Sequence, residues 1–419
     1  MHSKRIYRSI APLLPSRPAF SPSLRIAPLA TSPPRTGSFL RTMSSAGTVA
    51  DTELKTLATL VRKKFDVAIA AGDAFFYPSD KITLQESEAS GVAWQIRTVP
   101  ALLKKPSDNK TPESKSPEDK PQQNKSDVFA PPYVPNLHVK DVGEHVMLLN
   151  KFCVVPQHFL MVTREFASQD LPPSPATLSL AYRTVAAHRA GATELLAFYN
   201  CGATAGASQP HRHLQFVQCP PLDTTSEEAV EKGRISQDEQ DRIVDAEHKV
   251  PVEALLDRIE RDGKEHDAVH ALPLPWQHFV ALLNPPPAAR TSEAEMEQYI
   301  GNKFMGLLDA LFRARMFGSQ EAATGKPAFN VLITRRAMHL IPRAHEEFDQ
   351  LPGKHDSDGK IGSLSINSLG YAGFMLTRSL EEQEALRSMP GGVEHVLRST
   401  GAAPVEDVTV QAGLPTTNM

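Results

Sequence analysis

One stretch of the chain, residues 200–215, reads Asn-Cys-Gly-Ala-Thr-Ala-Gly-Ala-Ser-Gln-Pro-His-Arg-His-Leu-Gln. An apolar run from Glu194 to Asn200 precedes its small residues, and the alternation from His211 to Cys219 is typical of a strand. The residues between, 201–210, include Gly202 and Gly206 and connect the two runs as a loop. The stretch therefore predicts a strand, a glycine-containing loop and a second strand.

The alternation of side chains along the second strand predicts which residues lie together. His211, His213 and Gln215 project from one face, whereas residues 212, 214 and 216 project from the other. The three groups on the first face lie about 7 Å apart, from a rise of roughly 3.3 Å per residue. The preceding loop offers backbone N–H groups to an anion, because glycine permits close approach. Together these features predict a phosphate pocket.

A histidine in such a pocket is a suitable nucleophile toward phosphorus. Neutral imidazole has one unprotonated nitrogen near pH 7, and the adduct that it forms is labile enough to be transferred onward. We expect His213 to attack, with His211 or its carbonyl orienting the ring and Gln215 donating to a phosphate oxygen. On the pattern alone, an H-x-H pair also suits a zinc site or a structural pair in a non-catalytic zinc or nucleotide-binding protein.

Composition excludes several classes of protein. The chain has 45 basic and 48 acidic residues and a formal net charge of -3, so no global basic field favours a nucleic-acid partner. It has 3 cysteines and no CxxC pair, which argues against a disulfide scaffold and a cysteine-only zinc site. No apolar run of about 18 residues is present, so we expect no membrane partner.

Residues 1–50 differ from the rest because they combine many serines with basic residues and contain no acidic residue. The basic residues are Lys4, Arg5, Arg8, Arg17, Arg25, Arg35 and Arg41. This composition predicts a disordered or targeting tail, and Met43 is an alternative start that would remove most of it. We expect a cytoplasmic or nuclear protein, with mitochondrial import as the alternative.

The rest of the chain mixes helices and strands without a regular βαβ alternation, which predicts an α+β fold with largely antiparallel strands. Residues 106–127 are polar and predict a solvated loop. Expected helices run from 51 to 70, from Ser174 toward Gly191, and onward from Ser292 and Ser379. Expected strands cover 145–150, 159–163, 194–200, 211–219, 279–283, 328–334, 339–341 and 371–377, and 220–267 is part loop, part helix.

The segment 200–215 resembles the histidine-triad superfamily in its transferase form, in which glutamine replaces the third histidine. Its Asn, Gly, Ser and H-x-H-x-Q layout is similar to that of galactose-1-phosphate uridylyltransferases and, more closely, of fungal diadenosine tetraphosphate (Ap4A) phosphorylases. Three further segments carry the second resemblance: Leu148-Leu149-Asn150-Lys151-Phe152, Pro156-Gln157-His158, and Ile366-Asn367-Ser368-Leu369-Gly370-Tyr371-Ala372-Gly373.

The resemblance implies a histidine-triad-like fold, a mainly antiparallel sheet with flanking helices. It implies an N-terminal phosphorylase domain at 51–221, a connecting segment at 222–270, a C-terminal ATP adenylyltransferase domain at 271–402 and a tail at 403–419. The implied activity is phosphorolysis of Ap4A to ATP and ADP through an adenylyl-histidine. A hydrolase on the same scaffold and a sugar-1-phosphate uridylyltransferase remain alternatives.

The resemblance also implies roles for individual residues. The catalytic residues are His213, His211 and Gln215. The substrate contacts are Lys105, Asn150, Lys151, Asn200, Gly206, Ala207, Ser208, Gln209, Gln215, Asn367, Ser368, Leu369, Phe374 and Arg378. Lys104 leaves the register at Lys105 open by one residue.

Three of these contacts depart from the family pattern. Leu369 replaces an expected Thr, Phe374 an expected Met and Arg378 an expected Lys. Taken singly, Asn150, the lysines and the Asn367-Ser368 pair also suit a strand end, solvated charges and a turn, and Phe374 also suits the core. His158 and His339 lie in apolar runs and are expected to be core histidines.

The implied ligands are a nucleotide, inorganic phosphate and a divalent cation. We expect Mg²⁺ to accompany the polyphosphate rather than to occupy a protein cage, and we expect no organic cofactor. A monomer is the expected state.

Overall fold

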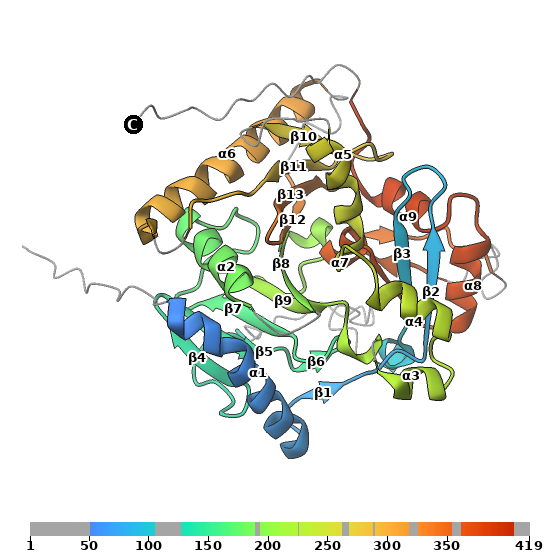
Figure 1. The fold of residues 1–419 in the computed structure, drawn as a ribbon, viewed down its shortest axis with the longest axis horizontal. Coiled ribbons are helices and arrows are strands. Elements are labelled where there is room, and N and C mark those ends of the chain that lie inside the picture. Colours follow the sequence, from blue (N-terminus) through green and yellow to red (C-terminus); the bar gives the residue numbers. More distant parts are fainter. Residues whose placement is uncertain are drawn as a thin grey trace, which may run out of the picture. The chain divides into compact units, whose positions relative to one another are not determined.

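Nine strands join in one sheet in the order β10-β11-β13-β12-β8-β9-β7-β5-β4 (Figure 1). The structure, a computed structural model, describes residues 51–104, 127–188, 193–224, 226–261, 268–287, 290–317, 326–353 and 362–405. In chain order the strands are β4 (His138–Val142), β5 (His145–Leu149), β7 (Phe159–Thr163), β8 (Glu194–Cys201), β9 (His213–Cys219), β10 (Val269–Ala271), β11 (Phe279–Leu282), β12 (Phe329–Ile333) and β13 (Ala337–Pro342). All neighbours in this sheet are antiparallel, as the sequence predicts.

Both halves of the chain contribute to this sheet. The junction is the pairing of β8 with β12, which places Asn200 opposite Asn330. Because β8 leads directly into the 201–210 loop, this pairing brings the second half of the chain beside the predicted phosphate pocket. The observed architecture is therefore α+β with a mainly antiparallel sheet.

Three helices cover one face of the sheet, which we call the helix face. They are α1 (Asp51–Ala71), α2 (Pro175–Ala187) and α6 (Glu293–Phe317), and Figure 1 shows them along one side of the sheet. Leu214 and Phe216 of β9 belong to the apolar core beneath these helices. Arg183 of α2 joins the three helices, because it pairs with Asp51 at 2.7 Å and Glu293 at 2.8 Å.

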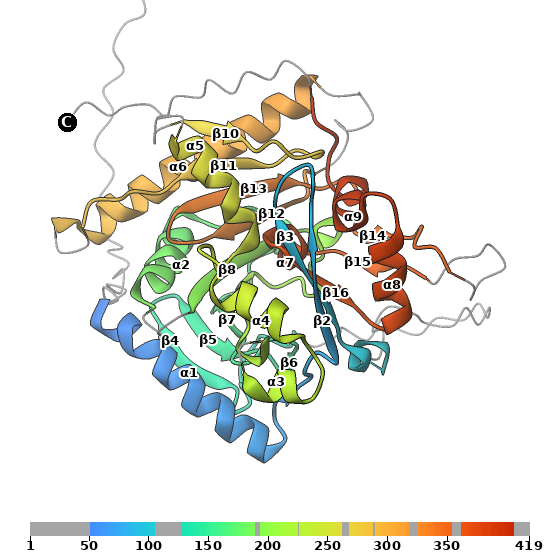
Figure 2. The ribbon, with the colours of Figure 1, turned by 45° about the vertical axis from the view of Figure 1, so that its right-hand side comes forward.

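The opposite face, which we call the site face, packs against a smaller layer (Figure 2). This layer contains a three-stranded sheet in the order β16-β3-β2. Its elements are β2 (Lys81–Glu86), β3 (Ala93–Thr98), β16 (Phe374–Thr377), α7 (Ser368–Ala372), α8 (Leu380–Ser388) and α9 (Gly392–Thr400). Val217 of β9 and Phe198 of β8 belong to this second core, so alternate residues of each strand serve the two faces.

Shorter elements complete the described chain. They are β1 (Phe75–Phe76), η1 (Pro100–Lys104), β6 (Phe152–Cys153), η2 (Ala203–Ala205), η3 (Leu222–Thr224), α3 (Glu227–Glu231), α4 (Gln237–Val244), η4 (Pro251–Leu255), α5 (Leu256–Arg261), β14 (Glu347–Phe348) and β15 (Leu364–Ser365). The described helices include none with the length and apolar character that crossing a membrane requires.

Two expected strands differ from the structure. The first half of 371–377 is helical, because the Asn367 side chain accepts a hydrogen bond from the Leu369 N–H and begins α7. Gly373, with φ of 120°, ends this helix, and only Phe374–Thr377 forms a strand. The strand expected from residue 211 begins at His213, because His211 makes only an isolated bridge to Ser168.

Candidate active site

The strand, loop and strand predicted around residues 200–215 are β8, a loop containing η2, and β9. Leu214 and Phe216 point to the helix face and Val217 to the site face, which places His213 and Gln215 on the site face by alternation. Gln215 is half-buried, and its side chain has no hydrogen-bond partner among the described residues. Its amide is therefore available to a ligand beside His213.

The ring of His213 is buried and held in one orientation. Its Nδ1 lies 2.8 Å from the backbone oxygen of His211, so Nδ1 carries a proton and donates it. In a neutral ring Nε2 is then unprotonated and keeps its lone pair. Burial lowers the pKa of His213 to about 4, which keeps the ring neutral near pH 7. The expected orienting carbonyl is thus in place, and Nε2 is the ring atom that keeps a lone pair for a ligand.

His211 has different chemistry, because both of its ring nitrogens face acceptors. Nδ1 lies 2.7 Å from a carboxylate oxygen of Asp127, and Nε2 lies 2.8 Å from the backbone oxygen of Thr163. The Thr163 hydroxyl, 3.0 Å from Nε2, donates to the Glu165 carbonyl and can only accept from the ring. Both ring nitrogens of His211 are therefore already hydrogen-bonded within the protein. His211 is placed to orient His213 through its backbone carbonyl rather than to attack.

Aromatic rings cover the two histidines. The ring centroid of Phe129 lies 5.0 Å from that of His213 and 6.1 Å from that of His211. Phe166, an exposed residue, lies 5.4 Å from His211. Asp127 ends the polar segment 106–127 and Phe129 follows it, and sequence reasoning gave neither of them a role in the site. The signal available for them was a single aromatic residue after a charged run, which is too common to identify a site.

Gln169 is a further residue that sequence reasoning missed. Its side chain accepts from the His213 N–H at 2.8 Å and donates to the carbonyls of Asn200 at 2.8 Å and His213 at 3.3 Å. The ladder between β8 and β9 ends at the pair Phe198 and Gln215, so the two strands separate where the loop begins. The buried amide of Gln169 replaces the missing ladder bonds and fixes the backbone of His213.

The loop presents free backbone donors. The N–H groups of Ser208 and Gln209 have no partner in the described part of the chain, as an anion site requires. Gly206 has φ of 85°, and a Cβ there would lie 2.8 Å from Cβ of Asn367 and 3.0 Å from the Ile366 carbonyl. The loop therefore packs directly against the Asn-Ser-Leu-Gly segment that sequence analysis assigned to the same site.

Asn200 is a buried link between these segments. Its Oδ1 accepts from the side chain of Asn330 at 2.9 Å and from the hydroxyl of Ser368 at 2.6 Å. Its Nδ2 donates to the carbonyl of Gly206 at 3.4 Å. Asn200 and Ser368 are thus brought together, as expected for one site, and their side chains hold the loop in place. Asn330 was not identified from the sequence.

Two of the remaining predicted contacts of the first half, Asn150 and Lys151, lie in different surroundings although they are neighbours in the chain. Asn150 lies 3.0 Å from Nδ1 of His158, so its amide donates to that ring and helps to bury His158 as a core residue, as expected. Lys151 is exposed, with its ammonium 5.6 Å from the centre of the Phe152 ring. Lys105 lies outside the described residues, and of Lys104 only the backbone is described.

The predicted contacts of the second half are mostly buried. Leu369 and Phe374 belong to the second core, and the side chain of Asn367 caps α7. Arg378 pairs with Glu382 at 2.6 Å and follows β16. Because β16 and β3 run parallel, their C-terminal ends lie at the same end of the small sheet. Arg378, which follows β16, therefore lies at the same end as η1, which follows β3.

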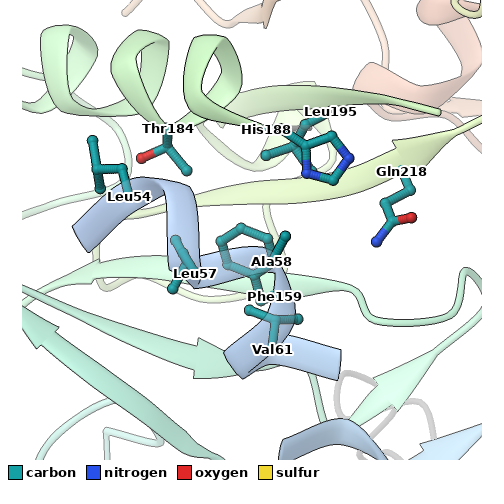
Figure 3. A pocket seen from close by; sticks show the side chains of 9 residues that line it. All are labelled: Leu54, Leu57, Ala58, Val61, Phe159, Thr184, His188, Leu195 and Gln218. Atoms are coloured by element: carbon teal, nitrogen blue, oxygen red, sulfur yellow. The ribbon is translucent and has the colours of Figure 1, made fainter. Parts of the chain in front are cut away.

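A small cavity between α1 and the sheet lies on the helix face, away from His213 (Figure 3). Its walls are mainly apolar, with the polar groups of His188, Thr184 and Gln218 along one side. The Thr184 hydroxyl already donates to the Leu180 carbonyl and the Gln218 amide to the side chain of Gln157, both at 2.8 Å. The cavity lies on the opposite face of the sheet from His213 and Gln215.

One group of potential metal ligands occurs in the described residues, namely Glu247, His248 and Asp257. Nε2 of His248 lies 2.7 Å from Asp257, and its Nδ1 accepts from Arg336 at 2.8 Å. Both ring nitrogens are thus already bonded, and neither is available to a cation. The group does not fit a metal centre.

The chain is similar to known proteins over most of its length. A sequence model of the Ap4A phosphorylase N-terminal domain matches residues 49–232, and one of the ATP adenylyltransferase C-terminal domain matches residues 272–403. Diadenosine 5',5'''-P1,P4-tetraphosphate phosphorylase 2 of Saccharomyces cerevisiae is 26% identical over 350 residues, covering 81% of this chain and 93% of the relative.

Solved structures of yeast Ap4A phosphorylase Apa2 share the fold. The complex with AMP has a TM-score of 0.57 and 24% identity, covering 83% of this chain and 98% of the other. The complex with Ap4A has a TM-score of 0.58 and 23% identity, covering 82% and 97%.

The matched sequence models define a nucleotidyltransferase, and its candidate site places a neutral, oriented histidine beside a loop of free amides. The two sequence models together match most of the chain, in the expected order. The chain belongs to the Ap4A phosphorylase family.

Proposed function

We propose that this chain cleaves Ap4A by phosphorolysis, with His213 as the carrier of the adenylyl group. Nε2 attacks the α-phosphorus of one adenylyl unit, the bond to the bridging oxygen breaks, and ATP leaves. An oxygen of inorganic phosphate then attacks the same phosphorus, the P–N bond breaks, and ADP is released. The observation that carries the proposal is the Nδ1–H bond of His213 to the His211 carbonyl, which leaves Nε2 unprotonated.

The groups around His213 suit the charge that develops during attack. The free N–H groups of Ser208 and Gln209 and the amide of Gln215 supply donors without a competing partner in the described chain. Donors that are already oriented stabilise a transition state more than solvent does, because they need not reorganise. Glutamine at 215, where a hydrolase of this class has a third histidine, supplies a neutral donor, and we propose that phosphate reaches the adduct in place of water.

The acceptor is tested by supplying or withholding phosphate. With phosphate, we expect Ap4A to give ATP and ADP at a rate that rises and saturates with phosphate concentration. Without phosphate, the adenylyl group should stay on His213 and appear as an acid-labile, base-stable mass increase of the intact protein. Anion-exchange separation of the nucleotides and intact-protein mass spectrometry measure the two results. Efficient formation of ATP and AMP without phosphate would identify a hydrolase instead.

The pKa of His213 predicts the pH dependence of the first step. Burial lowers this pKa to about 4, so Nε2 stays unprotonated well below the usual pKa of 6.5. Every phosphate of Ap4A is bridged on both sides and has no ionisation near neutral pH to obscure the effect. We expect the single-turnover rate of ATP release to change little from pH 8 to about 5.5 and to fall toward pH 4.

The matching control is the stability of the protein over the same range. A histidine with a lowered pKa stabilises the fold above pH 6.5, and this contribution is lost as pH falls through about 4. His145, with a pKa of about 4, and His339, with a pKa of about 3, act in the same direction because both are buried. Circular dichroism therefore has to accompany each rate measurement. An acid limb centred near 6.5 in folded protein would contradict the prediction.

We propose Mg²⁺ as part of the substrate, bound to the polyphosphate rather than held by protein ligands. In support, Mg²⁺ prefers oxygen ligands and commonly binds through substrate phosphates. The proposed partners are a small nucleotide and inorganic phosphate, without nucleic acid or membrane, and the proposed active form is a monomer. Metal analysis of the purified protein tests the rival reading of the H-x-H pair as a zinc site.

A further inference from the structure

Arg343 is a buried cation next to the sheet junction, directly after β13. Its side chain is only 7% exposed. Its guanidinium donates to four oxygens: the side-chain oxygen of Asn330 at 2.8 Å and the carbonyls of Thr400 at 3.2 Å, His345 at 2.7 Å and Glu346 at 3.3 Å. It also lies 5.0 Å from the centre of the Tyr371 ring. Each of these contacts is to a neutral group.

No described residue forms an ion pair with Arg343. Glu346 attracts it only from a distance, and the carboxylate of Glu346 accepts a hydrogen bond from Ser365 at 2.8 Å. Burial lowers the pKa of Arg343, although guanidinium retains its proton near neutral pH. A buried charge that has hydrogen bonds but no ion-pair partner is costly, and strongly perturbed charged groups cluster at functional sites.

A chain of hydrogen bonds leads from Arg343 to the phosphate-binding loop. Arg343 donates to Oδ1 of Asn330, and Nδ2 of Asn330 donates to Oδ1 of Asn200 at 2.9 Å and to the Ala205 carbonyl at 2.8 Å. Nδ2 of Asn200 donates in turn to the Gly206 carbonyl. The bonds all point the same way, so the cation polarises each amide in the series. The carbonyls of Ala205 and Gly206, two residues of the phosphate-binding loop, are therefore held by hydrogen bonds from this chain of amides.

We propose that Arg343 is a positioning residue of the active site: through Asn330 and Asn200 it holds the phosphate-binding loop, and its buried charge favours ligands with more phosphate groups. The inference rests on the proposed function, because the loop is taken to bind the polyphosphate. It predicts that Arg343 contributes more to the binding of ATP than of AMP, since ATP carries more negative charge. A purely structural arginine would affect both ligands equally.

The test compares Arg343→Met, which removes the charge, with Arg343→Lys, which keeps it. The dissociation constants of ATP and AMP are measured by calorimetry at fixed salt, and thermal unfolding shows that each variant is folded. The result is expressed as the preference for ATP, the ratio of the two constants. The matched control is Arg336→Met, because Arg336 lies in the β12–β13 turn and its charge is balanced by Asp257 at 2.9 Å and Glu260 at 3.0 Å.

We expect Arg343→Met to reduce the preference for ATP by about tenfold, because the interaction of a buried charge scales with ligand charge. Arg343→Lys should keep most of the preference but lower kcat for Ap4A, since one ammonium cannot bond to all four oxygens. Arg336→Met should leave the preference unchanged. An unchanged preference in Arg343→Met, or an equal loss in Arg343→Lys and Arg343→Met, would overturn the proposal.

A second variant keeps the proposal testable if Arg343→Met does not fold. Asn330→Asp places a carboxylate against the guanidinium and balances its charge, and it also removes the hydrogen bonds that the amide donates to Asn200 and Ala205, so it tests the charge and the network together. This variant should also reduce the preference for ATP, and a wild-type preference would overturn the proposal. Failure of the proposed function would be seen separately, as wild-type protein that binds nucleotides but does not form ATP and ADP from Ap4A and phosphate.

Discussion

His213→Ala is expected to lower kcat for Ap4A phosphorolysis by about 10⁴-fold or more, the size of loss that follows removal of an enzyme nucleophile. The variant has no atom that can take the place of Nε2, so no adenylyl-protein can form. Neither His211, whose ring nitrogens are both hydrogen-bonded, nor Gln215, which is a weak nucleophile, can substitute. The measurement is ATP release at saturating Ap4A and phosphate, together with intact mass after incubation without phosphate.

Controls separate loss of chemistry from loss of structure. His395→Ala removes an exposed histidine far along the chain and should leave the rate unchanged. His211→Ala and Gln215→Ala should reduce the rate by about 10- to 10³-fold, because they affect orientation and charge stabilisation without removing the nucleophile. If folded His213→Ala, free of wild-type protein, still turned over Ap4A at an appreciable rate, a covalent role for His213 would be wrong.

Gly206→Ala is expected to lower kcat/KM for Ap4A by about 10²-fold, the effect of displacing reacting groups by about 1 Å. The added Cβ would lie 2.8 Å from Asn367 and 3.0 Å from the Ile366 carbonyl, so the loop has to move. Any such movement shifts the free amides of Ser208 and Gln209 relative to Nε2 of His213. The measurement is steady-state kinetics with Ap4A, alongside thermal unfolding.

The matched control for this variant is Gly72→Ala. Gly72 has φ of 73°, close to the 85° of Gly206, but a Cβ there would meet nothing within 4 Å. Both variants incur the backbone cost of a left-handed alanine, about 1 kcal/mol, whereas only Gly206→Ala disturbs the site. Equal kinetics in the two variants would show that the loop does not depend on close packing against residues 366–367.

Local sequence predicted the elements that depend on local chemistry. Ser174 accepts from the N–H of Thr177 and begins α2, as its position before Pro175 suggested. Ser292 and Glu295 form the expected reciprocal cap of α6, with distances of 2.7 Å and 3.2 Å. These interactions join residues three positions apart, so a single turn of sequence contains them. The first half of the segment 371–377 was predicted incorrectly, because a side-chain cap and Gly373 outweigh its apolar strand-like composition, whereas residues 374–377 form the expected strand.

The sequence by itself determined that His213 and Gln215 share one face of a strand, because alternation follows from the covalent geometry of an extended chain. It also determined that a glycine-containing loop precedes them. Only the tertiary structure decided which residues hold the strand and loop in position. Gln169 binds the backbone of His213 where β8 and β9 separate, Asp127 contacts the ring of His211, and a hydrogen-bond network links the loop to Arg343. Asn330 and Asn200 are 130 positions apart, and their contact depends on β8 pairing with β12. No local pattern encodes such pairs, because packing of the whole sheet brings them together.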